Sequence, residues 1–414
     1  MIKLNVSLTL TSGKKIPAGE LVVADPDVQG RLQGQFRYSP NYLDFPESFP
    51  LDPIHLPLTQ EVFNADRPYS GVHGVFEDSL PDDWGRRILA RRYTLIRKDQ
   101  RVPQLLALLG AEGMGAIGYV QGTIAFSNEQ EDDVDGRHLT ELQRLATEFE
   151  KDATSINDEM SLLFRAGSSP GGARPKALII DRGIRYLAKF NSIKDQFDVV
   201  ALEAAAMELA RRAGIEAALS RCVTCGAQKV LLVERFDVSE GGPGRNHMIS
   251  MQTLLKADGY YNAGYNDLAG VVRRISTEPA QDLLKLFKQM IFNVMIGNTD
   301  DHLKNFCMMF DGAVWKLSPA FDLVPNIGLN HEHVLRIGSE TIVASRENLY
   351  IEAKNFGIKS RGKADKIIDA VFSKVSSWRE VFIEHNVPSS DIKIIGRDIT
   401  ERMAKLDTRF EVSD

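Results

Sequence analysis

The chain has 414 residues, of which 43% are hydrophobic and 26% charged, a globular balance that excludes a largely disordered or fibrous protein. Its net charge of −6 argues against a protein that coats nucleic acid through an overall basic surface. No apolar run reaches the ~18 residues of a membrane-spanning helix, so we expect no membrane contact. Because a single core rarely grows beyond ~250–300 residues, the length predicts two or three packed units.

The first unit, residues 1–125, is predicted to be β-rich. Short alternating stretches at 6–10, 20–23 and 34–38 are separated by turn residues, as in half-buried strands. The first six residues alternate like a strand and do not form a basic and then apolar targeting signal. Between residues 76 and 92, apolar side chains recur at three- and four-residue steps, which predicts a helix that Pro81 opens. A second apolar helix is expected at 103–109.

The second unit is expected over residues 126–240. Its acidic segment 127–138 is interpreted as an exposed linker. A glycine-rich turn at 167–172 precedes two apolar runs, at 177–180 and 184–190, that predict a hairpin. A helix over 197–212 and strands at 222–223 and 230–233 follow. Since three cysteines cannot form a disulfide framework, we expect a reducing cytoplasm and a structural use of Cys222 and Cys225.

Residues 241–414 predict an all-helical lobe, with helices at 280–297, 364–378 and 390–408. In the loop after the first of these, Asp300 is followed five positions later by Asn305, the spacing of a protein-kinase catalytic loop. Asp300 would orient the attacking hydroxyl and accept its proton. Asn305 would offer a carbonyl oxygen to Mg²⁺, which prefers oxygen ligands. Asp322, beyond a hairpin-like turn at 310–312, would complete this Mg²⁺ site at the β- and γ-phosphates of ATP.

Upstream residues predict the rest of an ATP site. Lys189 on a strand and Glu203 on the following helix match the pair with which kinases hold the α- and β-phosphates. His302 and Lys304 complete the expected catalytic set, with Lys304 as a positive charge near the reacting phosphate. The other predicted nucleotide contacts are Gly171, Gly172 and Ala173, whose backbone would cover the γ-phosphate, and Glu234 and Phe236, which would flank adenine.

These motifs resemble the HipA family of bacterial toxin kinases over almost the entire chain. The catalytic loop of that family reads Thr-Asp-x-His-x-Lys-Asn-Phe, matched by 299–306, and its metal segment reads Pro-x-Tyr/Phe-Asp, matched by 319–322. Its hinge, Val-Glu-Arg-Phe-Asp, matches 233–237, and its glycine loop, Ser-x-x-Gly-Ala-x-x-Lys, matches 169–176. In the N-terminal half, 76–82 and 113–116 resemble Phe-x-x-Leu-Leu-Pro-Asp and Gly-x-x-x-Val-Gly-Ala. Pro170 and Gly171 make the glycine loop differ from this pattern.

The resemblance implies an α+β, protein-kinase-like fold, the HipA fold, with a β-rich N-terminal domain beside a two-lobed kinase region. It implies a Ser/Thr protein kinase that uses ATP and Mg²⁺ and phosphorylates a protein of the translation machinery, such as an aminoacyl-tRNA synthetase. It also implies autophosphorylation in the glycine loop, where Ser169 is the matching position and the adjacent Ser168 is the alternative. A HipB-like helix-turn-helix antitoxin would neutralise the toxin and link it to operator DNA.

Two alternatives share the same core motifs. A small-molecule phosphotransferase would carry the same Asp300, Asn305 and Asp322, although it would not need the matched N-terminal domain. A catalytically silent co-repressor would keep the fold, although it would not need the complete set of catalytic groups. Both remain open at the level of the sequence.

Overall fold

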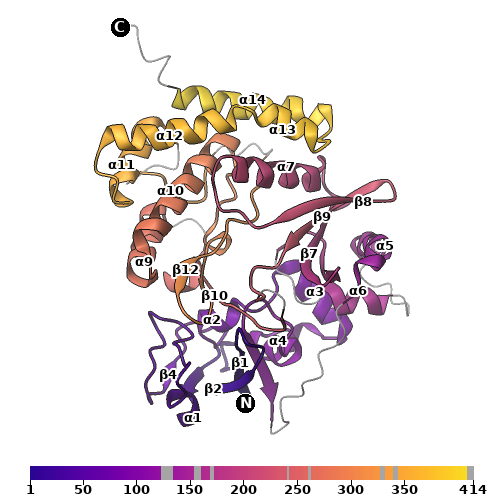
Figure 1. The fold of residues 1–414 in the computed structure, drawn as a ribbon. Helices are drawn as coiled ribbons and strands as arrows, with labels where there is room; N and C mark the ends of the chain where they lie inside the picture. Colours follow the sequence, from indigo (N-terminus) through magenta and orange to yellow (C-terminus); the bar gives the residue numbers. More distant parts are fainter. Residues whose placement is uncertain are drawn as a thin grey trace.

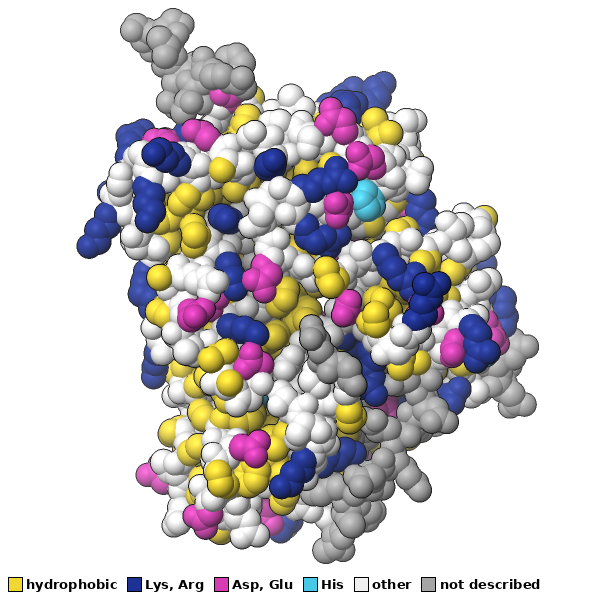
Figure 2. All heavy atoms as spheres, viewed as in Figure 1, with side chains coloured by type: hydrophobic (Ala, Val, Ile, Leu, Met, Phe, Trp, Pro, Cys, Tyr) yellow, Lys and Arg dark blue, Asp and Glu magenta, His cyan; other side chains and the backbone are white. Residues whose placement is uncertain are grey.

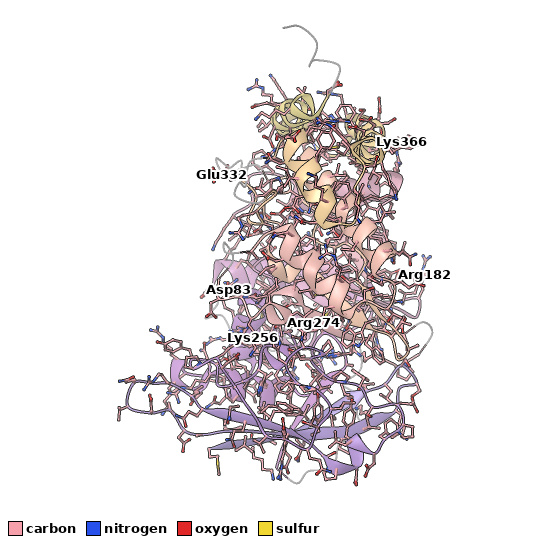
Figure 3. The ribbon with its side chains drawn as sticks, turned by 90° about the vertical axis from the view of Figure 1, so that its left-hand side faces the viewer. Asp83, Arg182, Lys256, Arg274, Glu332 and Lys366 are labelled. Carbon is pink, nitrogen blue, oxygen red and sulfur yellow. The ribbon has the colours of Figure 1, made fainter. Side chains whose placement is uncertain are left out.

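The computed structural model describes residues 1–122, 134–152, 160–167, 172–239, 242–259, 263–326, 332–338 and 344–407. Three antiparallel sheets occur in these ranges: one in the N-terminal domain, and two between that domain and the long C-terminal helices (Figure 1). Seen from the side, the N-terminal sheet forms a base beneath the helical body (Figure 3). None of the helices in the described ranges has the length and apolarity needed to cross a bilayer.

The N-terminal sheet has the strand order β4-β3-β2-β1-β5. Its strands are β1 (Ile2–Thr9), β2 (Lys15–Val23), β3 (Gly34–Tyr38), β4 (Phe63–Asn64) and β5 (Ile117–Gln121). Leu4, Val6 and Leu8 alternate along β1 and are fully buried, so the β-rich character expected for this part of the chain is confirmed. The helical segments of this region are α1 (Pro40–Leu43), α2 (Gly74–Glu77), α3 (Asp83–Arg92), η1 (Arg97–Asp99) and α4 (Val102–Leu109).

The continuous helix expected over 76–92 is wrong, because the chain forms two helices there, α2 and α3. Pro81 lies in the break, where it lacks an amide hydrogen and disfavours helical backbone at Leu80. The break lets α3 leave the N-terminal sheet and join a different core. Trp84 of α3 is fully buried there, with its ring perpendicular to Phe149 at a centroid distance of 5.5 Å.

The second sheet has the order β6-β7-β9-β8, built from β6 (Lys176–Asp181), β7 (Ile184–Phe190), β8 (Ser220–Cys225) and β9 (Gln228–Glu234). The predicted hairpin is confirmed, with Lys176 opposite Lys189 and Asp181 opposite Ile184. Cys222 and Cys225 lie on β8 without a disulfide.

Helices cover both faces of this sheet. α7 (Val199–Arg212) packs on one face, whereas α5 (Leu139–Lys151) and α6 (Met160–Gly167), which the sequence interpretation did not include, pack on the other after the short η2 (Gly136–His138). Successive side chains of β9 point to opposite faces of the sheet, and both faces are packed. Leu231 and Val233 face the α7 side, whereas Val230 and Leu232 face α5 and α6.

The C-terminal lobe is mainly helical, with α8 (Met251–Leu254), α9 (Tyr265–Ile275), α10 (Pro279–Ile296), α11 (Arg346–Asn355), α12 (Arg361–Val375), α13 (Trp378–Glu384) and α14 (Ser389–Leu406). It is not all-helical, however. A small sheet of β10 (His247–Ser250), β11 (Cys307–Phe310) and β12 (Trp315–Leu317) also lies there, and β11 and β12 form the hairpin expected around 310–312. The buried α10 packs on α9, α12 and α14 and ends at Gly297 in the left-handed conformation, with φ +70°.

On the face drawn in Figure 2, basic and acidic side chains are interspersed, so no large patch of one sign covers that face. This distribution agrees with the modest negative net charge of the chain.

Candidate active site

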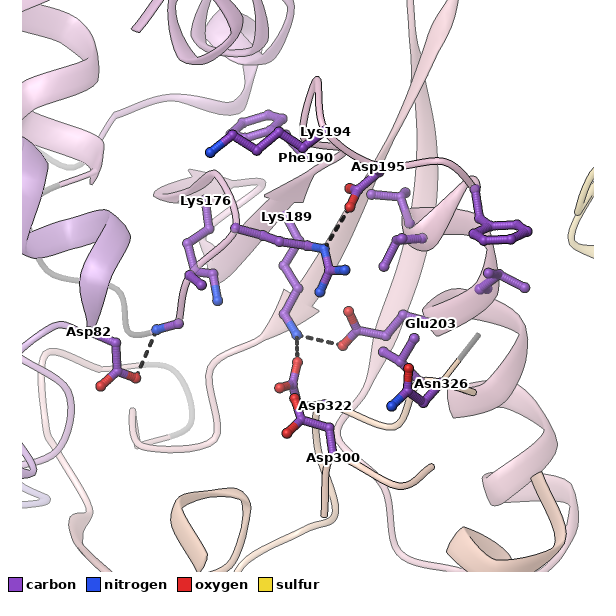
Figure 4. A pocket seen from close by; sticks show the side chains of 18 of the residues that line it. Asp82, Lys176, Lys189, Phe190, Lys194, Asp195, Glu203, Asp300, Asp322 and Asn326 are labelled. Carbon is purple, nitrogen blue, oxygen red and sulfur yellow. Dashed lines mark hydrogen bonds and ion pairs between the residues drawn. The ribbon is translucent and has the colours of Figure 1, made fainter. Parts of the chain in front are cut away.

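A cleft of about 830 Å³ lies where the second sheet meets the helical lobe (Figure 4). We call it the central cleft; its walls come from the start of α3, residues 172–176, β7, α7 and the loops after α10 and β12. The residues predicted from the sequence that line it are Gly172, Ala173, Lys189, Glu203, Asp300, His302, Lys304 and Asp322. Ser168, Ser169 and Gly171 lie outside the described residues.

Lys189 is the electrostatic centre of the cleft. Its Nζ lies 2.5 Å from Oε1 of Glu203 on α7 and 2.6 Å from Oδ1 of Asp322 (Figure 4). Burial alone would lower the pKa of Lys189, but the carboxylates of Asp322 and Glu203 raise it above its usual value. The lysine therefore stays charged, and the predicted pairing of a strand lysine with a helix glutamate is present in the structure.

Asp322 is held in a strained backbone conformation. Its φ is +57°, a region that residues with a side chain rarely adopt and that often marks functional loops. The ring of the neighbouring Phe321 lies 5.6 Å from that of Phe236, which packs the start of the loop against the segment that follows β9. Lys189 lowers the pKa of Asp322, so the carboxylate is ionised. The side chain points into the cleft (Figure 4).

The loop after α10 presents Asp300 beside Asp322 (Figure 4). Asp300 remains exposed to the cleft, where reduced hydration raises its pKa and the nearby Asp322 raises it further. Asn305 ends the short η3 (Leu303–Asn305), and its Nδ2 donates to the carbonyl oxygen of Asp300 at 3.0 Å. Because the amide nitrogen makes this bond, the amide oxygen is the atom that Asn305 can present to a cation.

Asp301, which the sequence interpretation did not select, fixes this loop from behind. It is fully buried and accepts hydrogen bonds from Oη of Tyr265 at 2.7 Å and from the amide of Val334 at 3.0 Å. His333 Nδ1 lies 3.0 Å from Oδ2 of Asp301, the oxygen that also accepts the hydrogen bond from Tyr265. The sequence did show that Asp301 directly follows the expected catalytic Asp300. It did not show the role of Asp301, because its partners are far away in the sequence.

Lys304 and His302 both line the central cleft. Lys304 extends toward the N-terminal part of the chain, where its Nζ lies 2.7 Å from Oδ1 of Asp82. Asp82 was quoted as the end of an N-terminal motif but not predicted as a site residue. The catalytic loop is thus in direct contact with the segment that begins α3.

Lys176 is a second lysine of the cleft that was not predicted as a site residue. It begins β6 opposite Lys189 and is only 7% exposed. Burial, and then the charge of Lys189, lower the pKa of Lys176 to about 8. Its position at the end of the glycine-rich motif was the signal in the sequence.

A smaller pocket of about 220 Å³ continues from the cleft, and we call it the inner pocket. Its apolar lining comes from Leu80, Met114, Leu187, Val233, Phe236, Met248, Ile249, Cys307 and Phe321, and charged residues, among them Asp82, Lys176 and Lys189, line the side that faces the cleft. Glu234 and Asn305 lie on its wall as well. The amides of Glu234 and Arg235 donate to the carbonyl oxygens of Leu219 and Arg185, so a planar ligand would have to use other backbone groups of this segment.

Asp237 anchors the strand end next to the inner pocket. It is completely buried, and its carboxylate pairs with Arg235 at 2.6 Å and with Arg245 at 3.3 Å. It also accepts a hydrogen bond from the Gly115 amide at 2.8 Å. Two of the motifs found separately in the sequence, at 113–116 and 233–237, therefore meet in space.

The residues present fit a magnesium ion better than a metal held by protein ligands alone. No group of three or more His, Cys, Asp or Glu side chains suited to a metal occurs among the described residues. Mg²⁺ typically takes one or two carboxylates, with water and substrate phosphates completing its shell. Asp322 and the amide oxygen of Asn305 suit that coordination.

A lysine-bearing small sheet over a helical lobe, with a Lys189–Glu203 pair and two polar loops facing one cleft, defines a protein-kinase-like fold. Comparisons with known proteins agree. A family model described as HipA-like C-terminal domain matches residues 168–379, about half of the chain, and one described as HipA N-terminal domain matches residues 14–120. The chain belongs to the HipA family.

The similarity to individual proteins is either confined to part of the chain or low in sequence identity. Two proteins of Sinorhizobium fredii (strain NBRC 101917 / NGR234), named "Putative kinase Y4mE" and "Putative kinase Y4dM", are each 31% identical, over 157 and 100 residues. These stretches are 35% and 24% of this chain, and they span only 37% and 24% of the relatives. HipA of Shewanella oneidensis MR-1, solved with HipB and operator DNA, has a TM-score of 0.69 over 97% of this chain and 96% of that one. At 18% identity, this likeness shows the fold alone.

Proposed function

We propose that this protein is an ATP- and Mg²⁺-dependent serine/threonine protein kinase that acts as a HipA-type toxin. The observation that carries the proposal is the convergence of Lys189, Glu203, Asp300 and Asp322 on one cleft, from four separate elements. Phosphoryl transfer asks mainly for positioning and for neutralisation of phosphate charge, and these residue types supply both.

The triphosphate would lie beneath residues 172–176. Lys189 would contact the α- and β-phosphates while Glu203 holds its ammonium group in place. Lys176, beside it on β6, would add a second positive charge to the same anion. The backbone at Gly172 and Ala173 would cover the γ-phosphate.

Asn305 and Asp322 would hold Mg²⁺, which when bound supplies positive charge to the phosphate oxygens. Asp300 would accept a hydrogen bond from a serine or threonine hydroxyl and take its proton as the oxygen attacks the γ-phosphorus. The bond from that phosphorus to the β,γ-bridging oxygen breaks, and ADP leaves. Lys304 and His302 belong to the same loop and line the cleft, where Lys304 would contribute positive charge.

The inner pocket would accept adenine, whose flat apolar faces suit the side chains of Phe236, Leu187 and Ile249. Glu234 would lie beside the base. Since the amides of Glu234 and Arg235 are already bonded, the base would use the carbonyl of Glu234 or the backbone of Phe236.

We further propose that the substrate is a protein of the translation machinery, such as an aminoacyl-tRNA synthetase, and that Ser169 is autophosphorylated. A HipB-like helix-turn-helix antitoxin would neutralise the toxin and connect it to operator DNA. The family membership supports these roles, as does the near complete overlap in fold with the HipA that was solved with HipB and operator DNA.

Mass spectrometry of the intact protein after incubation with Mg-ATP tests the proposal. We expect the wild type to gain a phosphate that maps to the peptide containing Ser169, and we expect the Asp300→Asn and Asp322→Asn variants to gain none. The Asp311→Asn variant is a matched control, because Asp311 belongs to a surface pair with Lys316 in the β11–β12 turn. An unmodified wild type that also labels no protein in a cell lysate would contradict the proposal.

A further inference from the structure

Asp82 joins the two loops that face each other across the central cleft. Its Oδ2 accepts a hydrogen bond from the Gly172 amide at 2.9 Å, and its Oδ1 lies 2.7 Å from Nζ of Lys304. Gly172 is 90 residues and Lys304 is 222 residues away in the sequence. One carboxylate from the N-terminal part of the chain therefore contacts both the end of the glycine-rich turn and the catalytic loop.

The local structure shows that Asp82 does not serve its own helix. It occupies the N-cap position of α3, where an aspartate usually accepts a hydrogen bond from an amide in the first helical turn. Asp82 makes no such capping bond. Its two oxygens instead contact Gly172 and Lys304, so the helix lacks a side-chain cap and the carboxylate links two sides of the cleft.

The charge of Asp82 is also maintained by its surroundings. Burial in the cleft opposes ionisation, but Lys304, the Gly172 amide and Lys176 together lower its pKa. An ionised carboxylate makes stronger hydrogen bonds to N–H donors than a neutral group does.

The rest of the α3 start strengthens the hold on the glycine-rich turn. The amide of Trp84 donates to the carbonyl oxygen of Gly172 at 3.2 Å, and its indole Nε1 donates to the carbonyl oxygen of Lys176 at 2.9 Å. Gly172 has a φ of +95°, and a Cβ there would collide with Nζ of Lys176. The described part of the turn is thus held at both ends by α3 in a conformation that only glycine adopts easily.

We propose that Asp82 is a positioning residue that ties the glycine-rich turn to the catalytic loop and thereby sets the affinity for the triphosphate of ATP. This inference rests on the proposed function, because it assumes that the turn covers the phosphates. It makes a residue from the N-terminal part of the chain a part of the nucleotide site.

Hydrogen exchange of the full-length protein without nucleotide tests the tie directly. In Asp82→Ala, we expect the amides of a peptide spanning 172–176 to exchange about tenfold faster, because the bond from Gly172 is lost. Asp82→Asn keeps an oxygen for that amide but loses the ion pair with Lys304, so we expect an intermediate rate. Asp83→Asn is the control, since the side chain of Asp83 is 71% exposed and forms an ion pair with Arg87 of its own helix.

Nucleotide titrations then separate positioning from general damage. For Asp82→Ala we expect the Kd of Mg-ATP to rise about tenfold, the effect of one lost charge-assisted bond. The Kd of adenosine should stay within about twofold of the wild type, because adenosine has no phosphate for the turn to cover. A variant that is simply misfolded would lose both ligands.

The outcomes distinguish this inference from the proposed function. A wild type that binds Mg-ATP, with Asp82 variants that match it in exchange and in affinity, would overturn the role of Asp82 alone. A wild type that binds no nucleotide would overturn the proposed function and this role with it. Faster exchange at 172–176 together with selective loss of ATP affinity supports the proposal.

Discussion

The substitution Lys189→Met tests how the cleft is held together. The side chains of Lys189 and Glu203 are only 12% and 5% exposed, so removing the ammonium group leaves a buried carboxylate without its partner. Breaking such a pair typically costs about 3–5 kcal/mol. We expect a loss near 3 kcal/mol in the free energy of unfolding, the lower end, because Glu203 can take up a proton.

The same substitution should make stability depend on pH. Burial already raises the pKa of Glu203, and Lys189 is the charge that opposes this rise. A carboxyl whose folded pKa lies above its unfolded value destabilises the folded state only when it is ionised. The loss caused by Lys189→Met should therefore be smaller at pH 5 than at pH 8, because more of Glu203 is protonated at the lower pH.

Urea unfolding followed by tryptophan fluorescence at pH 5 and pH 8 measures both effects. Lys316→Met is the control, since Lys316 pairs with Asp311 at 2.8 Å but is 42% exposed, and such surface pairs contribute less than about 1 kcal/mol. Equal losses for the two variants, or a loss at Lys189 that does not change with pH, would refute the buried pairing described for the cleft.

Three further predictions concern single residues of the site. Asp300→Asn should lower the rate of phosphate transfer by about 10²–10⁴-fold while the Kd of Mg-ATP changes less than twofold, as measured with radiolabelled ATP and by calorimetry. Since the pKa of Lys176 is lowered to about 8, the affinity for ATP should fall as the pH rises from 7 to 9, and Lys176→Met should remove this dependence in the same titrations. Asp237→Asn should lower the free energy of unfolding by about 3 kcal/mol, because it breaks a buried ion pair. The pKa of Asp237 is lowered to about 2, so in the wild type this contribution should be present above pH 4 and be lost between about pH 4 and 2, as thermal melts would show.

Local patterns in the sequence predicted the first three strands, the second sheet, several of the long helices and part of the site, but not α9, α11 or α13. The hairpin of β6 and β7 places Lys189, and the helix that follows places Glu203, so the order of elements already implied their pairing. Alternation likewise located β1 to β3. The apolar residues of 139–151 recur at helical spacing, so the sequence contained a signal for α5 that the sequence analysis overlooked.

Two of the residues that were missed, Asp82 and Asp301, depend on contacts between distant parts of the chain. Asp82 acts through Gly172 and Lys304, and Asp301 acts through Tyr265 and His333, and no local spacing encodes either set of partners. The break at Pro81 has a local cause, but the core that α3 then joins is defined by helices far along the chain. Tertiary packing, and not local periodicity, therefore determines the partners of these residues and the core that α3 joins.

The central claim is that Lys189, Asn305 and Asp322 act on one magnesium-bound triphosphate. A crystal structure of the protein with Mg²⁺ and a non-hydrolysable ATP analogue tests this most directly. We expect a metal ion bound by Asn305 and Asp322, a phosphate oxygen at Lys189 Nζ and the base in the inner pocket. A nucleotide bound elsewhere, or a metal ion that contacts neither Asn305 nor Asp322, would contradict it.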